Sequence, residues 1–164
     1  SGLHSAARLA EKLSQKMRVE LYVVSRVDSH TQKRLKDKYP FRIQFMDSVP
    51  REQIPWLMRS SHVLFSEEVN PPCPNSVIES LACGLPVVGF DTGSLSEIVQ
   101  ADAGRLAAYG TNHWKLEKPE LSGLVGAAEE LLEDQGRFRK AARDHAEKAL
   151  GLDQMMDEYL KVLL

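Results

Sequence analysis

The chain has 164 residues, enough for one α/β domain that buries most of the apolar surface exposed by its unfolded form. Its formal net charge is −2 with acidic and basic residues interspersed, which argues against an electrostatic grip on nucleic acid or an anionic membrane. The two cysteines lack metal-ligand spacing and are expected to be free thiols of a reducing compartment. No apolar run approaches the roughly 18 residues that span a bilayer, and the first residues lack a signal-peptide pattern. A cytoplasmic location is therefore expected.

Hydrophobic spacing predicts an amphipathic helix at 3–13, followed by short strands that alternate with helices. The predicted strands are 19–25, 41–46, 63–65, 86–90 and 105–108, of which 19–25 and 63–65 are expected to be buried. The predicted helices are 30–38, 51–60, 75–83 and 95–99; after a loop at 109–118, the chain is helical from 119 onward, with breaks at Gly136 and Gly151. This alternation predicts a Rossmann-like three-layer α/β/α domain around a parallel sheet.

In an open parallel sheet the ligand site lies beyond the carboxyl ends of the strands. One strand-to-helix connection there, residues 66–79, contains three prolines that restrict its backbone. The first amides of the following helix, at Ser76, Val77 and Ile78, are expected to lack helical acceptors, and the helix dipole adds positive charge there. A diphosphate would be well placed against them.

Glu79 is expected in the first turn of this helix, where its carboxylate could accept two hydrogen bonds from a vicinal diol such as a ribose. Spacing alone favours the alternative that Ser76 and Glu79 form a capping box. The same spacing recurs at Ser94 and Glu97, where capping is again the favoured role. Gly93, just before, would let the backbone come close to a ligand.

Residues 74–88, with the sequence PNSVIESLACGLPVV, together with Gly93 and Glu97 resemble the donor-site core of retaining glycosyltransferases. The family is the GT-B group known as family 4 or group 1, and the resemblance extends over nearly the whole chain. It implies one domain, residues 1–164, that forms the C-terminal half of a GT-B fold. This domain would bind a nucleoside-diphosphate sugar as substrate for retaining transfer of a hexosyl group, without a metal or other cofactor.

The resemblance also assigns roles to particular residues. It implies ribose binding by Glu79 and diphosphate binding at the start of the helix, by the backbone of Asn75, Ser76 and Val77 beside Pro74. Gly93 completes this group. Three further candidates follow from their places after predicted strands: Arg26, for which a solvated loop position is equally good, and the backbone of Ser48 and Val49.

The sequence departs from the family pattern in two places. The first acid of the family's glutamate pair is replaced by Pro71, and Glu67 and Glu68 are the candidate catalytic substitutes. The family's first strand, with the cations that grip the diphosphate, is also missing, which would leave an exposed sheet edge. The expected partners are therefore the acceptor-binding N-terminal domain or another chain that covers this edge. Alone, the chain is expected to be inactive, and any membrane association would come through the absent part.

Two other classes of protein compete with this hypothesis. The first is a non-catalytic nucleotide-binding or interaction module that keeps the fold, which Pro71 favours. The second is an unrelated doubly wound domain such as a phosphoryl receiver, against which Ser66 and Glu67 argue because an acceptor aspartate is needed there. The five histidines are scattered without metal spacing, so no metal site is predicted.

Overall fold

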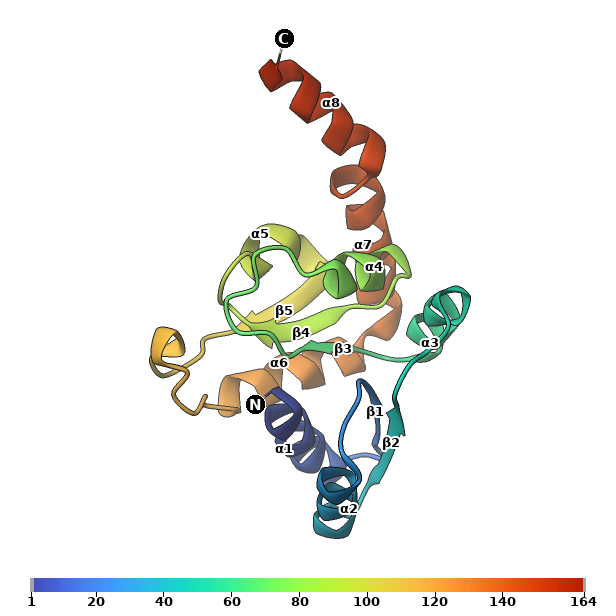
Figure 1. The fold of residues 1–164 in the computed structure, drawn as a ribbon. Helices are drawn as coiled ribbons and strands as arrows, with labels where there is room; N and C mark the ends of the chain where they lie inside the picture. Colours follow the sequence, from blue (N-terminus) through green and yellow to red (C-terminus); the bar gives the residue numbers. More distant parts are fainter. Residues whose placement is uncertain (1, 164) are drawn as a thin grey trace.

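The computed structural model of this protein describes residues 2–163 as a mixed α/β fold (Figure 1). The helices are α1 (Gly2–Ser14), α2 (Ser29–Lys38), α3 (Ile54–Ser60), α4 (Asn75–Ala82), α5 (Leu95–Ile98), α6 (Ser122–Glu133), α7 (Gln135–Ala149) and α8 (Leu152–Leu163). The strands are β1 (Glu20–Val24), β2 (Arg42–Met46), β3 (Leu64–Ser66), β4 (Val87–Phe90) and β5 (Gly104–Ala107). Short 3-10 turns occupy η1 (Arg51–Gln53), η2 (Ala101–Ala103) and η3 (His113–Lys115).

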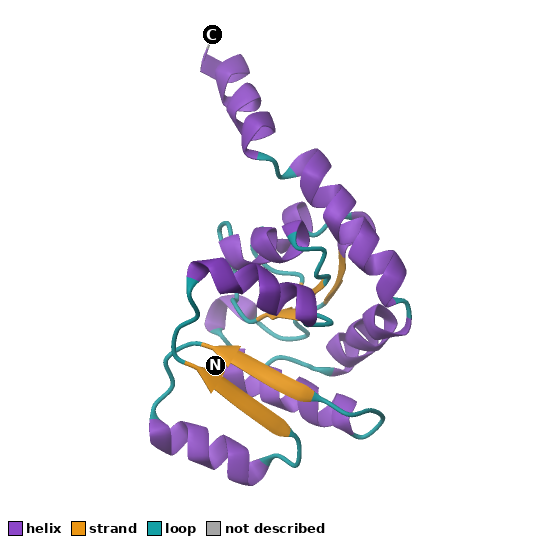
Figure 2. Ribbon diagram, turned by 90° about the vertical axis from the view of Figure 1, so that its right-hand side faces the viewer, coloured by secondary structure: helices purple, strands orange, loops and turns teal. Residues whose placement is uncertain are grey.

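All strand pairs are parallel, as predicted, but they form two sheets rather than one. β1 pairs with β2 from Glu20 beside Arg42 onward, and the other sheet has the order β3-β4-β5. Figure 2 shows the separate β1-β2 pair below the larger sheet. Within residues 2–163, the end strands β1, β2, β3 and β5 each have one edge without a strand partner.

The central strand β4 divides the main core into two layers because its side chains alternate between the faces of the sheet. Val88 and Phe90 pack with α6 and with Leu9 and Leu13 of α1. Val87 points to the opposite face. Its neighbours there are the buried side chains of α4, α5 and α7, namely Val77, Leu81, Leu95, Ile98, Ala142 and Ala146. Helices thus cover both faces, which confirms the predicted three-layer architecture.

The β1-β2 pair has a smaller core of its own. Ile43 of β2 packs with Ala7 of α1 and with Leu35 of α2. The opposite face of β1 is open, since Tyr22 is 41% exposed and Val24 is 48% exposed. The prediction that this strand is buried on both faces was therefore wrong. Side chains along β1 alternate between a face that packs on the core and a face that is exposed to solvent.

The C-terminal half is helical, as predicted, but one break lies elsewhere than expected. The chain leaves α6 at Asp134, whose carboxylate accepts a hydrogen bond from the Arg137 amide and so begins α7. Gly136 is then the second residue of α7, and the prediction of a break there was wrong. The break at Gly151 is confirmed, and α8 beyond it extends away from the body of the molecule with its side chains exposed (Figure 1).

An ion-pair network joins β5 to the helical layer. The Arg105 guanidinium donates hydrogen bonds of 2.9 Å to Asp102 and 2.8 Å to Glu130, and Arg137 lies beside both carboxylates. These bonds to Arg105, with the added charge of Arg137, hold the pKa of both carboxyls below their usual values. Arg105 and Arg137 also lie over the Phe138 ring, at 4.6 and 4.4 Å from its centroid.

Candidate functional site

The candidate site is built on the loops that follow β3 and β4, which are neighbours in one parallel sheet. Ser66 ends β3 and is buried, and the chain then forms loop 67–74 before entering α4. Loop 91–94 leaves the adjacent end of β4. Because parallel strands end at the same edge, the two loops lie side by side. Hydrogen bonds between the two loops hold loop 67–74, which leads into α4, in a fixed position.

Hydrogen bonds of Asn70 hold loop 67–74 in place. This residue has φ of 56°, a left-handed conformation that asparagine tolerates better than most side chains. Its amide donates to Thr92 Oγ1 at 3.3 Å, and its Oδ1 lies 2.6 Å from Nδ1 of His113. Three segments distant in sequence therefore meet at Asn70, and they hold the loop from both sides.

Pro71, which the resemblance aligns with the family's first acid, is buried. Its carbonyl accepts a 2.9 Å hydrogen bond from the Ser94 amide. Gly93 lies directly beneath with φ of 59°, and a Cβ atom there would come within 2.5 Å of the Pro71 carbonyl oxygen. Gly93 thus allows close approach of the backbone, and what it approaches in this structure is the neighbouring loop.

α4 begins at Asn75, with Pro74 as its N-cap residue and no side chain bonded to the cap. The Pro74 carbonyl accepts from the Val77 amide at 3.0 Å and from the Ile78 amide at 3.3 Å. The expectation that these two amides lack acceptors was therefore wrong. Among the residues that the structure describes, the unpartnered amides at this end are those of Asn75 and Ser76.

The capping box expected from Ser76 and Glu79 is absent from this helix. Ser76 is the second residue of α4, so its hydroxyl is not at the cap, and Glu79 is the fifth residue rather than part of the first turn. The proline at the cap position starts the helix through its fixed φ instead of through a side-chain bond. Within the described part of the chain, no bond is recorded for the Glu79 carboxylate.

One face of α4 presents the predicted donor residues to solvent. Asn75, Ser76 and Glu79 are exposed, and their spacing of three and four residues places them on the same side of the helix. The opposite side is anchored, with Val77 and Leu81 fully buried in the core. Of the predicted residues at this helix start, Pro74 and Val77 are buried and do not contribute side chains to this surface.

The C-terminal end of α4 is also held in place, by a side-chain hydrogen bond and a glycine. Ser80 is buried and donates its hydroxyl hydrogen to the Leu85 carbonyl at 2.9 Å. Gly84 has φ of 68°, as expected for the left-handed residue that stops a helix. The helix is therefore held at both ends, and the face with Asn75 and Glu79 has a fixed orientation.

The expected capping by Ser94 and Glu97 is likewise not seen. Ser94 does precede α5, but its side chain makes no cap hydrogen bond. Its hydroxyl oxygen is buried with no hydrogen-bond partner in the structure. The Ser94 residue instead contributes its amide to Pro71, so its contact fixes loop 67–74.

The two candidate catalytic acids occupy different surroundings. A Cβ atom on Gly2 would lie 2.6 Å from Glu67 Oε2, which places this carboxylate against the first turn of α1. The helix dipole stabilises a negative charge in that position. Both side chains are exposed, but within residues 2–163 the Glu68 carboxylate has no hydrogen bond or ion pair and no such neighbouring helix start.

Three other predicted donor residues belong to the second sheet. Arg26 follows β1, and Ser48 and Val49 follow β2. Arg26 and Ser48 are exposed, whereas Val49 is half-buried. No hydrogen bond described here joins any of the three to loops 67–74 or 91–94.

His113 and Thr92 are functional neighbours that the sequence did not reveal. The His113 ring lies 6.0 Å from the Tyr109 ring and 5.2 Å from the Trp114 ring, whose side chain is 77% exposed. His113 is 43 residues from its partner Asn70 in the sequence. No local pattern signals such a contact.

Between residues 2 and 163, no group of three His, Cys, Asp or Glu side chains is placed to hold a metal ion. No helix in that range is long and apolar enough to cross a bilayer.

Comparison with known proteins places this arrangement in a family. The family model described as glycosyl transferases group 1 matches residues 2–134. No curated protein matches the chain. Among solved structures, the pneumococcal O-GlcNAc transferase GtfA in complex with UDP and GlcNAc is similar at a TM-score of 0.62 and 16% identity, covering 98% of this chain and 32% of its own.

TarM gives the same TM-score and identity, over 97% of this chain and 31% of its own. At such identities these likenesses establish the fold alone. The chain spans about a third of the length of these relatives. Together with the family match over most of its residues, the shared fold shows that the chain belongs to the group 1 glycosyltransferases.

Proposed function

We propose that this chain is the donor-binding domain of a retaining glycosyltransferase and that it binds a nucleoside diphosphate sugar at the start of α4. The observation that carries the proposal is the exposed face of α4. Two unpartnered amides, at Asn75 and Ser76, lie there beside the carboxylate of Glu79. The face is anchored from behind by the buried residues of the same helix.

The diphosphate is the ligand group that suits the two amides. A helix N-terminus carries about half a unit of positive charge, and unpaired N–H groups donate to phosphate oxygens. The hydrogen bonds to Asn70 and Pro71 hold loop 67–74 in place, so little reorganisation is needed when the anion binds. During transfer, the same amides would stabilise the charge that develops on the departing diphosphate.

Glu79 is proposed to bind the ribose. It lies one helical turn beyond Asn75 and Ser76, on the same exposed side. A carboxylate accepts hydrogen bonds from two adjacent hydroxyls, as in the ribose diol. A ligand that lies along this side of α4 would thus place its diphosphate at the amides and its sugar ring at Glu79.

The donor type, the stereochemistry of transfer and the absence of a metal requirement are proposed from the resemblance to the family. The named relative GtfA is described as bound to UDP and GlcNAc, which supports a nucleotide-sugar donor here. We propose metal-independent transfer of a hexosyl unit with retention, the acceptor being held by a second domain outside residues 1–164. The free thiols of Cys73 and Cys83 support a reducing, cytoplasmic setting.

A second candidate is a non-catalytic module that binds the nucleotide without transferring sugar. The observation that favours it is the burial of Pro71, which stands where the family has its first acid. This candidate shares the nucleotide site at α4. It differs in predicting that the bound donor stays intact when an acceptor and the acceptor domain are supplied.

Calorimetric titration with UDP and GDP tests the nucleotide site. We expect binding that Glu79→Ala weakens and that Glu133→Ala, an exposed carboxylate change on α6, leaves unaltered. Both variants should keep the parental melting temperature. Equal affinity of the two variants would remove Glu79 from the site, and no binding at millimolar nucleotide would refute the donor-domain proposal for this chain.

A further inference from the structure

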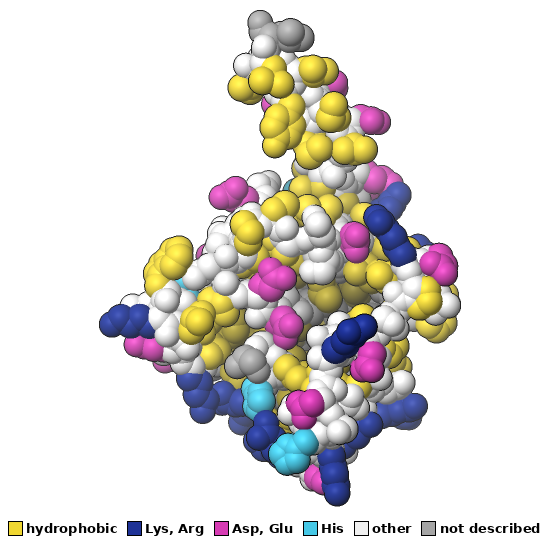
Figure 3. Space-filling view, in the orientation of Figure 1, with side chains coloured by type: hydrophobic (Ala, Val, Ile, Leu, Met, Phe, Trp, Pro, Cys, Tyr) yellow, Lys and Arg dark blue, Asp and Glu magenta, His cyan; other side chains and the backbone are white. Residues whose placement is uncertain are grey.

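The basic residues of this chain are concentrated at one end of the molecule. Residues 1–50 contain ten Lys and Arg against five Asp and Glu, whereas residues 51–164 contain eleven against eighteen. The first group forms α1, β1, α2 and β2, which lie together at the end opposite α8 (Figure 1). Figure 3 shows Lys, Arg and His side chains gathered over this α1-α2 end. The net charge of −2 therefore conceals two regions of opposite sign.

Ion pairing distinguishes the cations of α2 from many others in the chain. Arg105 on β5 and Arg137, Lys140 and Arg143 on α7 are each paired with carboxylates, and so are Lys16, Arg18 and Arg42 at the α1-α2 end. Within residues 2–163, by contrast, none of the four cations on α2 lies within ion-pair distance of a carboxylate. They are Lys33, Arg34, Lys36 and Lys38. Their charge is thus uncompensated and available to an external anion.

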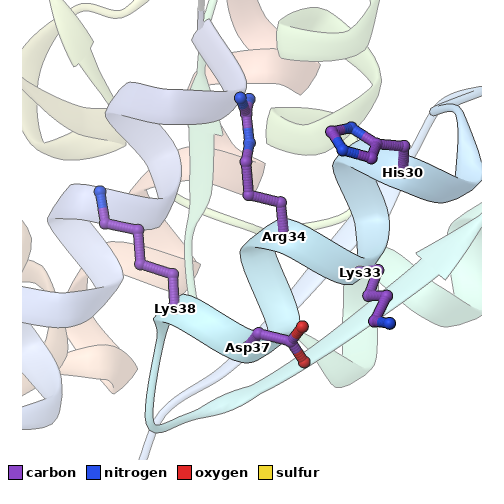
Figure 4. A pocket seen from close by; sticks show the side chains of 5 residues that line it. All are labelled: His30, Lys33, Arg34, Asp37 and Lys38. Carbon is purple, nitrogen blue, oxygen red and sulfur yellow. The ribbon is translucent and has the colours of Figure 1, made fainter.

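A shallow groove of about 450 Å³ marks this end of the molecule. It is lined by His30, Lys33, Arg34, Asp37 and Lys38, and Figure 4 shows Arg34 and Lys38 extending toward α1. Nη2 of Arg34 lies 3.4 Å from Nε2 of His4 on α1. Burial, together with the neighbouring cations Arg34 and Lys38, lowers the pKa of His4. Because a guanidinium can only donate, Nε2 of His4 is the acceptor in this contact.

We propose that the α1-α2 end binds the surface of a membrane rich in anionic phospholipid. An exposed Lys or Arg side chain gains little binding free energy from a single phosphate in water. A charged membrane surface attracts all of these side chains at once, so their contributions add. Each cation near such a surface raises partitioning roughly fivefold. Residues outside the donor site at α4 carry this function, which does not depend on the proposed transferase activity.

A planar surface suits this charge distribution better than a nucleic acid does. A membrane contacts the α1-α2 end alone. The acidic helix α8 lies at the opposite end, and charges separated by more than about 8 Å of physiological saline are largely screened. A long polyanion that extends beyond this end would come within reach of the acidic remainder of the chain and be repelled by it.

Vesicle flotation tests the proposal with the purified chain. The vesicles contain phosphatidylcholine alone or with roughly a third phosphatidylglycerol. We expect binding to the anionic vesicles that falls at high salt, and no binding to the neutral ones. The triple change Lys33→Glu, Arg34→Glu and Lys38→Glu should lower partitioning more than about 100-fold.

A matched control makes the same charge change elsewhere, with Lys115→Glu, Lys118→Glu and Lys148→Glu, all exposed and outside the α1-α2 end. It should retain most of the binding. If the glutamate triple does not fold, the corresponding glutamine triple replaces it and should lower partitioning at least tenfold. Equal losses in the patch and control variants, or no binding to anionic vesicles, would overturn the proposal. Tighter binding to duplex DNA, or equally tight binding to free glycerol phosphate, would also overturn the membrane surface as the occupant.

Discussion

Replacing Asn75 by proline would separate the role of the α4 amide from that of the side chain. Asn75 is the first residue of α4, a position where proline is well tolerated because the amide has no helical acceptor. Pro74 before it has φ of −77° and ψ of 103°, an extended conformation compatible with a following proline. The substitution therefore removes one N–H group and leaves the buried contacts of the helix in place.

The expected loss follows from the kind of hydrogen bond that is removed. A bond to a charged acceptor contributes about 1.5–3 kcal/mol, so the affinity for UDP or GDP should fall roughly 10- to 100-fold. The affinity for the corresponding nucleoside, which has no phosphate, should not change. The control variant Asn75→Ala keeps the amide and should bind the nucleotide as the parent does.

Calorimetry with the nucleotide and the nucleoside, alongside thermal unfolding, measures all these quantities. Melting temperatures of the two variants should agree closely, since both lose the same exposed side chain. If Asn75→Pro and Asn75→Ala bind the diphosphate equally well, the amide is not a phosphate ligand. An equal loss of nucleoside affinity would show that proline had disturbed the helix instead.

Three further substitutions test the framework of the site and the fold. Gly93→Ala should lower the free energy of unfolding by about 1–3 kcal/mol, because alanine is strained at φ of 59° and its Cβ would meet Pro71; chemical denaturation measures this. His113→Ala should cost about 1 kcal/mol and speed hydrogen exchange at the Asn70 amide, whereas unchanged exchange would show that loop 67–74 is held without the histidine. Arg105 lowers the pKa of its two carboxylate partners below the usual values near 4, so its stabilisation is present above pH 4 and is lost as the pH falls through the folded-state pKa values. Arg105→Gln should therefore lower the melting temperature more at pH 7 than at pH 3, and an equal effect at both would refute this coupling.

The order and type of the elements could be predicted because hydrophobic periodicity is a local property. The alternation of short strands with helices appears directly in the spacing of apolar residues, and the structure confirms it along the chain. Burial of β1 could not be predicted in the same way. Tyr22 and Val24 belong to an apolar run typical of an interior strand, yet nothing among the described residues covers their side of the sheet.

Helix starts were predicted less well because more than one kind of residue, such as a proline or a side-chain cap, can begin a helix. The spacing of Ser76 and Glu79 fits a capping box, but Pro74 fixes the helix start one residue before Ser76 and makes that box impossible. At α7, Asp134 caps the helix and Gly136 is tolerated within it. In both cases a residue just outside the recognised pattern determined the boundary.

The contacts that shape the candidate site are long-range and were therefore invisible in the sequence. The bond between His113 and Asn70 and the packing of Gly93 beneath Pro71 both join residues separated by more than twenty positions. The charge of the α1-α2 end was overlooked for a different reason. A net charge taken over the whole chain says nothing of how charges divide between faces.

These contacts also bear on the missing first acid. Pro71 is buried, and its backbone carbonyl accepts from the Ser94 amide and lies against Gly93, so a carboxylate side chain held in the same place would lose its hydration. Glu67 is held against the start of α1, where the helix dipole stabilises its charge. Glu68, exposed and without a recorded bond in the described chain, is free to turn toward a bound donor. The geometry thus favours Glu68 over Glu67 as the residue that would contact the sugar.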